Sequence, residues 1–184
     1  MYLLDSNIYI NFYDRYYRKD FFPTFWFKFL SILNSSVVIP EIVVSENYQD
    51  PWFKAWLKDN YKKNFIDHKS FALEWIEVIQ YIDNSPLYKD TALNSEKGWA
   101  NDRIADPWLI AIAKNKNYTI VTDEVKNINL NPRNPSRNVK IPDVCEELGV
   151  RCISMNQFFK EIGLSIWLKI YFGQFSINVK YLIW

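Results

Sequence analysis

Short apolar runs at residues 1–4, 35–40, 118–122 and 150–153 each predict a buried β-strand, because they are too short for helices and are bounded by turn residues. The longer segments between them carry apolar residues three or four positions apart, which predicts helices with one face against a core. The clearest stripe of this kind consists of Phe22, Trp26, Phe29, Leu30 and Leu33. Strands that alternate with helices are typical of an α/β fold.

Helix boundaries follow from proline and glycine. Pro23 is expected to separate two helices in the aromatic segment that follows the first strand, and Pro40 opens the helix after the second. A further amphipathic helix is expected over residues 70–84, and residues 85–98 predict a loop. Residues 105–113 are almost entirely apolar, which indicates a helix that is buried on every side.

The length of 184 residues suits one domain with a sizeable core. We expect this domain to span residues 1–163 and to close with helices over 141–148 and 154–162. The remaining residues, 164–184, form an atypical hydrophobic tail. Apolar and polar residues alternate within it, which predicts a half-buried strand that needs a sheet edge or another chain to cover it. The apolar positions are Phe175, Ile177, Val179 and Tyr181.

The aromatic content, net charge and cysteines limit which classes of function the chain can have. Aromatic residues make up 18% of the chain, which argues against disorder and leaves aromatic surface for an interface. The formal net charge of +1 gives no global basic field, so nucleic-acid binding has to be argued locally. Cys145 and Cys152 lack a metal-binding spacing, and the chain begins directly on a predicted strand. We therefore expect a cytoplasmic protein with reduced thiols and no membrane association.

The first predicted strand ends abruptly in a carboxylate, Asp5. In open α/β sheets, ligands bind just outside the carboxyl ends of the strands, so an acid at this point is placed for chemistry. The strand at 118–122 also ends in acids, Asp123 and Glu124. An aspartate at a strand-to-loop junction is also ordinary turn chemistry, so neither position decides the matter by itself.

Two glutamates share the helix that follows Pro40. Glu46 lies four residues after Ile42 and therefore projects from the apolar side, where a carboxylate needs a partner or a cation. Glu41 lies in the first turn, where the helix dipole favours it for structural reasons.

Asp106 precedes a proline at the start of the apolar helix, and by itself an ordinary N-cap explains it. Asp102, one turn earlier, is expected to face solvent. His68, the only histidine, lies in a polar Asp-His-Lys turn and is also expected to be solvated, so we assign it no role.

Residues 126–140 form the one locally basic segment, which contains no acid. Its basic residues are Lys126, Arg133, Arg137 and Lys140. A basic loop beside an acidic site can hold a phosphate backbone, and a solvated surface loop explains the pattern equally well. Arg15 lies among aromatic residues that can stack unpaired bases, although a protein-partner surface explains the aromatic surplus better.

Carboxylate oxygens are the hard ligands that Mg²⁺ and Mn²⁺ prefer, and such ions support phosphodiester hydrolysis. Without metal, clustered carboxylates repel one another, so at least one should have a raised pKa. Other enzyme classes fit poorly. The four glycines form no nucleotide-binding motif, and one histidine with two cysteines leaves no nucleophile triad.

Four segments resemble, in their order, the acidic motifs of PIN-domain nucleases: residues 3–7, the helix carrying Glu46, Ala105-Asp106-Pro107 and residues 121–124. Other segments resemble the signature of one bacterial subgroup, the VapC toxins: Arg15-Tyr16-Tyr17, Phe22-Pro23, Phe25-Trp26 and residues 140–145. The resemblance implies a three-layer α/β sandwich with a central, mostly parallel sheet flanked by helices. It also implies a Mg²⁺- or Mn²⁺-dependent endoribonuclease that cuts RNA.

The resemblance assigns metal-binding roles to Asp5, Glu46 and Asp106. The usual spacing selects Glu124 over Asp123 for the fourth acid, although most PIN domains have aspartate there. The hydroxyls of Ser6 and Thr122 would support these ligands. A small antitoxin protein would cover the site, with the aromatic segment 13–27 as the candidate contact, and homodimers are usual among relatives.

Two alternatives share this fold. One is a catalytically inactive PIN fold that binds RNA or protein, and the other is a nuclease that acts on DNA during repair. Binding that persists without cleavage in either metal would indicate the first, and direct comparison of RNA and DNA substrates would identify the second. No base-reading pattern is legible, so the sequence does not indicate which RNA would be cut.

Overall fold

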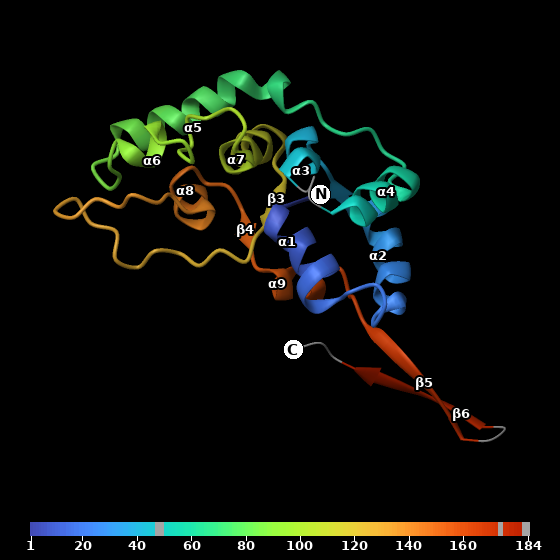
Figure 1. The fold of residues 1–184 in the computed structure, drawn as a ribbon. Helices are drawn as coiled ribbons and strands as arrows, with labels where there is room; N and C mark the ends of the chain where they lie inside the picture. The colour runs from blue at the N-terminus through green and yellow to red at the C-terminus, as the bar shows by residue number, and fades with distance from the viewer. Residues whose placement is uncertain (47–49, 173–174, 182–184) are drawn as a thin grey trace.

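A computed structural model describes residues 1–46, 50–172 and 175–181, with side chains described as far as Ile166. It shows an α/β fold with a four-stranded, all-parallel sheet flanked by helices (Figure 1). The strands are β1 (Tyr2–Leu4), β2 (Val37–Val38), β3 (Thr119–Val121) and β4 (Cys152–Ile153), in the order β2-β1-β3-β4. The four apolar runs thus form the four strands of this sheet, as predicted.

The central pair of strands positions the residues that follow them. Leu4 pairs with Val121 in the parallel register of β1 and β3. The backbone N–H of Asp5 donates to the carbonyl oxygen of Val121 at 2.9 Å, which extends the ladder by one residue. Asp5 and Thr122, the first residues beyond the two strands, therefore lie next to each other at the carboxyl edge of the sheet.

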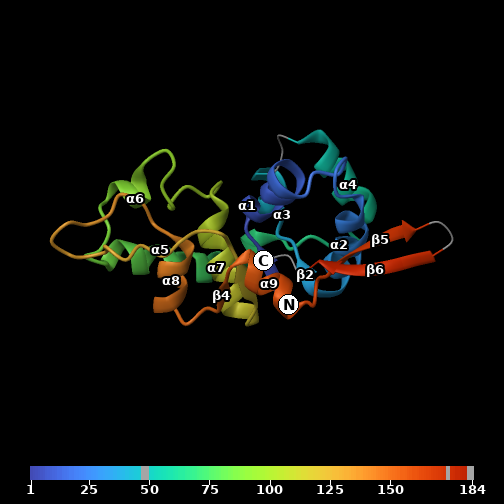
Figure 2. The same ribbon diagram turned by 90° about the horizontal axis from the view of Figure 1, so that it is seen from below.

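In both Figure 1 and Figure 2, α5 to α8 gather at one end of the molecule and α1 to α4 at the other, with β4 between them. The end that contains the N-terminal helices is built from α1 (Ser6–Ile10), continued by the π-helical η1 (Asn11–Tyr16), and from α2 (Pro23–Ser36), α3 (Glu41–Glu46) and α4 (Pro51–Asn60). Those that follow are the 3₁₀ segment η3 (His68–Phe71), α5 (Ala72–Asn84), α6 (Thr91–Asn94), α7 (Ala105–Lys116), α8 (Ile141–Glu147) and α9 (Met155–Glu161).

The aromatic segment builds much of the core. Phe12 is fully buried, and its ring packs edge-on against Phe25 and Phe29 with centroids 5.0 Å away in each case. Trp26, Phe29 and Leu33 are buried as the helical stripe predicted. Phe22 is not: it is 43% exposed, because it precedes the first turn of α2 and does not share the helical face.

One other prediction needs correction: residues 85–98 contain the short helix α6 rather than a continuous loop. In the tail, the predicted strand is present as β6 (Phe175–Tyr181), which pairs with β5 (Ile166–Phe172) in an antiparallel hairpin. The predicted alternation of buried and exposed side chains along β6 lies outside the described residues.

No helix within the described ranges is both long and apolar enough to cross a membrane.

Phe12→Ala should lower the free energy of unfolding by about 3–5 kcal/mol, because it leaves a cavity among rings that cannot collapse around it. Urea denaturation measures this loss. Phe27→Ala is the matched control: Phe27 is 79% exposed, so its loss should change stability by no more than about 0.5 kcal/mol. Equal effects of the two substitutions would contradict this account of the core.

Candidate functional site

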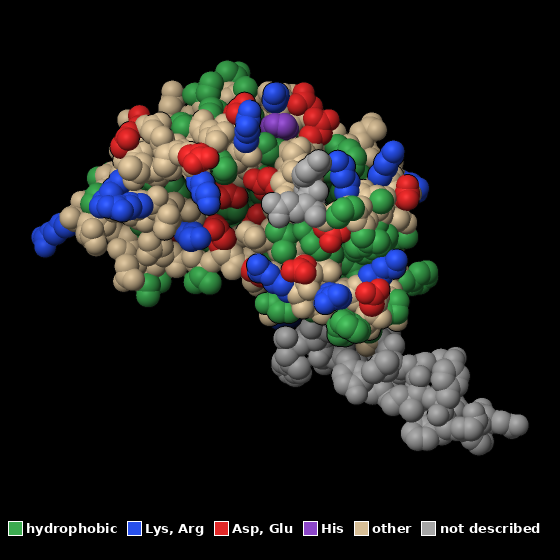
Figure 3. Space-filling model, in the orientation of Figure 1, with side chains coloured by type: hydrophobic (Ala, Val, Ile, Leu, Met, Phe, Trp, Pro, Cys, Tyr) green, Lys and Arg blue, Asp and Glu red, His purple; other side chains and the backbone are tan. Residues whose placement is uncertain are grey.

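Four carboxylates from remote parts of the chain lie near enough beyond the carboxyl ends of β1 and β3 to influence one another electrostatically, although no three of them have oxygens all within 4.8 Å of one another. They belong to Asp5, Glu46, Asp106 and Glu124, which we call the acidic cluster. Asp5, Glu46 and Glu124 all act electrostatically on Asp106, so the four charges lie within range of one another. Figure 3 shows acidic side chains gathered in a hollow near the middle of one face.

Asp5 is the most buried member, with 1% of its surface exposed. The Thr122 hydroxyl donates to Asp5 Oδ2 at 2.9 Å and accepts the backbone N–H of Glu124 at 3.1 Å. Thr122 therefore holds two members of the acidic cluster in a fixed relation. Burial raises the pKa of Asp5 to about 6, and the charges of Glu124 and Glu46 add to the effect.

Glu46 joins three elements. It ends α3, its Oε2 accepts a hydrogen bond from the Ser6 hydroxyl at the start of α1, and its Oε1 accepts the backbone N–H of Ala105 at 2.9 Å. Because Ala105 is the first residue of α7, Glu46 supplies a carboxylate to the N-terminus of that helix. The predicted need of Glu46 for a partner is thus met by protein groups.

Asp106 does not cap α7. The helix begins one residue earlier, at Ala105. Its N-cap residue is Ile104, whose side chain makes no capping hydrogen bond. The simple N-cap explanation of Asp106 is therefore wrong, because Glu46 takes the N–H of Ala105 instead. Within the described ranges, no hydrogen-bond donor reaches the Asp106 carboxylate.

The pKa of Asp106 is raised well above its ordinary value, chiefly by burial and then by the charges of Asp5, Glu124 and Glu46, while Lys140 opposes the shift. A raised pKa within the acidic cluster is what the sequence predicted. The main cause differs from the one expected, since burial contributes more than repulsion for both Asp5 and Asp106.

The structure separates the two acids that follow β3. Both oxygens of Glu124 are held in the cluster, one by the ammonium group of Lys140 at 2.7 Å and the other by the backbone N–H of Ile141 at 2.8 Å. Asp123 instead accepts hydrogen bonds from the Asn11 side chain at 2.6 Å and from the backbone of Met155 at 3.3 Å. Glu124 is therefore held by Lys140 and the start of α8, and Asp123 by Asn11 and the start of α9.

The basic candidates do not form one patch. Lys140 contacts the acidic cluster, whereas Lys126 pairs with Glu146 on α8. Arg15 is exposed and donates to the Asn11 side chain at 3.2 Å, two hydrogen bonds away from Asp123. The other two, Arg133 and Arg137, are exposed.

Sequence reasoning missed Asn11 and Asp143. Asn11 lies one helical turn before Arg15, and nothing in its local pattern indicates that it binds an acid more than a hundred residues away. Asp143 is 3% exposed; its Oδ1 accepts the backbone N–H of Asn127 at 3.0 Å, and its Oδ2 has no partner among the described residues. Asp143 lies in the first turn of α8, where the helix dipole favours an acid, so its sequence position gives no sign of a special role.

His68 is not solvated as predicted. Only 8% of its surface is exposed, and its ring packs edge-on against Trp108 of α7 with centroids 5.0 Å apart. A polar local sequence gave no sign of this, because the covering ring comes from a distant helix. Asp102 is exposed, as predicted.

The fold and the cluster together define an α/β domain with an all-parallel sheet and four acids beyond the ends of its central strands. The sequence matches the domain of unknown function DUF4411 over residues 2–166, so the chain belongs to the DUF4411 family. Comparison with curated proteins gave no match, and comparison with solved structures gave none either.

Asp5→Asn should stabilise the metal-free protein at neutral pH. The folded-state pKa of Asp5 is raised to about 6 from 3.8, so the stability that its protonated form contributes is complete below about pH 4 and is lost as the pH rises through 6. The substitution removes this loss and should raise the free energy of unfolding at pH 7.5 by up to about 3 kcal/mol.

Urea denaturation in the presence of a chelator, at pH 7.5 and at pH 4, measures the effect. The advantage of Asp5→Asn should shrink at pH 4, where the wild-type carboxyl is largely protonated. Asp102→Asn, at an exposed acid on the neighbouring segment, should show no such dependence. An advantage of equal size at both pH values would show that the charge of Asp5 is not its source.

Proposed function

We propose that this chain is a PIN-type, divalent-metal-dependent endoribonuclease that acts as the toxin of a toxin–antitoxin pair. One observation carries the proposal: carboxylates from four remote segments converge beyond the central strands of a parallel sheet, in the order that the PIN motifs follow. The match to a family of unknown function is compatible with this proposal and does not test it.

The acidic cluster fits Mg²⁺ or Mn²⁺ in its chemistry. Its ligand atoms are all carboxylate oxygens, and these ions prefer such hard donors. Asp106 is half-buried, and none of the described residues donates a hydrogen bond to its carboxylate; a partly desolvated carboxylate in that state is stabilised by a cation. Asp5, Asp106 and Glu124 would hold the ion, with Glu46 beside them. When bound, the ion supplies positive charge for the transition state of phosphodiester hydrolysis and acidifies a water molecule.

The residues around the cluster have separable roles in this proposal. Thr122 and Ser6 orient Asp5 and Glu46 by hydrogen bonds. Lys140 balances the charge of Glu124 and lies at the end of the basic loop, next to the site where a phosphate would approach. Because Asp5 and Asp106 must be ionised to bind a cation, metal affinity should increase with pH.

Exposed aromatic residues support the antitoxin as a partner. In the segment 13–27, Tyr16, Phe21, Phe22 and Phe27 are 54%, 69%, 43% and 79% exposed. Large exposed aromatic side chains at this density are common at protein interfaces. In the proposal, the antitoxin covers this surface in the cytoplasm, and the chain itself forms a homodimer.

Asp106→Asn should reduce cleavage of single-stranded RNA by at least about 100-fold in Mg²⁺ or Mn²⁺, because it removes the one acid with no other duty in the cluster. The matched control is Asp102→Asn, an exposed acid four residues earlier, which should cleave like the wild type. The assay compares labelled RNA and DNA of the same sequence, with and without a chelator.

Cleavage that survives the chelator or Asp106→Asn would refute the proposal. Cleavage of DNA alone would indicate the repair-type nuclease, and RNA binding without cleavage would indicate an inactive binding module. Expression of the wild type should inhibit bacterial growth while Asp106→Asn does not, and co-expression of an adjacent short reading frame should restore growth if it encodes the antitoxin.

The double substitution Arg133→Gln and Arg137→Gln should weaken RNA binding about equally for all sequences and lower the salt dependence of binding by about 1–2 units of slope, because these exposed residues would contact phosphates. Fluorescence anisotropy across a salt series measures this in the Asp106→Asn background. Lys58→Gln, at an exposed lysine on α4, is the control. An unchanged slope would exclude this loop from RNA binding.

A further inference from the structure

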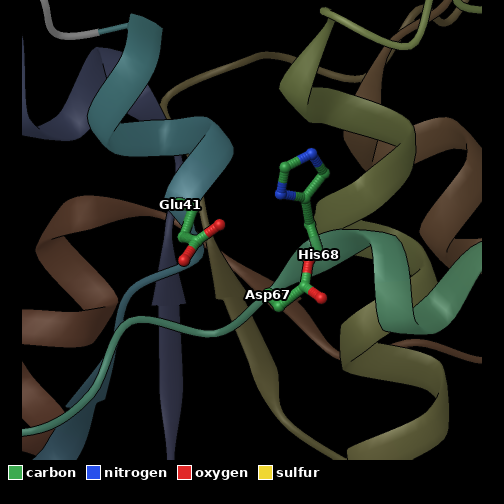
Figure 4. Close-up of side chains that lie close together, drawn as sticks. All are labelled: Glu41, Asp67 and His68. Atoms are coloured by element: carbon green, nitrogen blue, oxygen red, sulfur yellow. The ribbon is translucent and has the colours of Figure 1, made fainter.

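A second group of metal-type ligands lies outside the acidic cluster. It consists of Glu41 at the start of α3, Asp67 just before η3, and His68 (Figure 4). One ligand atom from each of these side chains lies within 4.8 Å of the other two. We propose that this group binds a divalent transition-metal ion of the zinc type.

The two carboxylates alone would not support such a site. Glu41 and Asp67 are exposed, and water satisfies exposed carboxylates without any ion. The observation that points to a ligand is the imidazole of His68. It is only 8% exposed, and its Nδ1 is buried with no hydrogen-bond partner among the described residues. In Figure 4 the ring presents a nitrogen toward the Glu41 carboxylate.

A buried polar atom without a partner destabilises the fold, and nearly all such atoms in native proteins are satisfied. An ion between the imidazole and the carboxylates would satisfy the Nδ1 of His68. The three ligand atoms lie within 4.8 Å of one another, so the exposed carboxylates of Glu41 and Asp67 would move inward to reach metal–ligand bonds of about 2.0–2.2 Å.

Backbone contacts place the three ligands before any ion binds. Pro40 and Ile66 form a parallel β-bridge, in which the N–H of Glu41 donates to Ile66 at 3.0 Å and the N–H of Ile66 donates to Ile39 at 2.9 Å. This bridge fixes the start of α3 beside the Asp67-His68 pair. The edge-on contact with Trp108 restrains the ring of His68.

The ligand set differs in kind from the acidic cluster. One imidazole and two carboxylates suit zinc-type ions, whereas the acidic cluster offers oxygen atoms alone. Burial lowers the pKa of His68, while the charges of Asp67 and Glu41 oppose the shift. His68 and Glu46 also line the same cavity of about 560 Å³.

The single histidine of the chain makes the site testable without interference from the acidic cluster, which contains no nitrogen ligand. Zn²⁺ is titrated into the full-length Asp5→Asn/Asp106→Asn variant while the two imidazole nitrogens are followed by ¹H–¹⁵N NMR. We expect a saturable change in the Nδ1 resonance of His68 that reaches completion at one equivalent of bound ion. Because this variant lacks two acids of the proposed nuclease, the result does not depend on that proposal.

Glu41→Gln should weaken Zn²⁺ binding at this site by at least about tenfold, since it removes one of three protein ligands at an exposed position where folding is not at risk. Asp83→Asn, at an exposed acid on α5, should bind like the parent. The proposal is overturned if Zn²⁺ leaves the nitrogen resonances of His68 unchanged, or if Glu41→Gln binds as tightly as the Asp83→Asn control.

Discussion

The structure around the sheet depends on keeping a carboxylate buried at the end of its central strand. Burial of a charged group is costly unless donors or opposite charges compensate for it, and Asp5 lies beside three other acids. Thr122 donates to Asp5, Ser6 and a backbone amide donate to Glu46, and Lys140 with another amide holds Glu124. These contacts connect the ends of two strands to the starts of three helices, so the fold and the acidic cluster form together.

Compensation is incomplete at one place. Asp106 is half-buried among like charges, and none of the described residues donates a hydrogen bond to its carboxylate. A sequence selected for stability alone would gain from an uncharged residue there, because an unpaired charge that is partly removed from water destabilises the fold. Retention of strain at one residue of an otherwise well-satisfied network is typical of a functional site, and this is why the nuclease proposal rests on Asp106 more than on its neighbours.

The short helix α3 links the acidic cluster to the group formed by Glu41, Asp67 and His68. It carries Glu41 at its first position and Glu46 at its last, and the rise between these two positions of an α-helix is only about 7.5 Å. Helix α7 also connects the two groups, because Asp106 belongs to the acidic cluster and Trp108, two residues later, packs against His68. An ion at the second group would therefore restrain both helices that supply acids to the first.

The sequence by itself determined the four strands, the helix that begins near Pro23 and the arrival of acids where strands end, because apolar runs, proline and strand ends act through neighbouring residues. Only the tertiary structure decided which acid after β3 turns inward, that Glu46 rather than Asp106 serves the start of α7, and that His68 is buried. In each of these cases the deciding partner is remote in sequence: Ile141 holds Glu124, Ala105 lies next to Glu46, and Trp108 covers His68. Local pattern places a side chain on an element, but its hydrogen bonds and burial depend on which distant element packs against it.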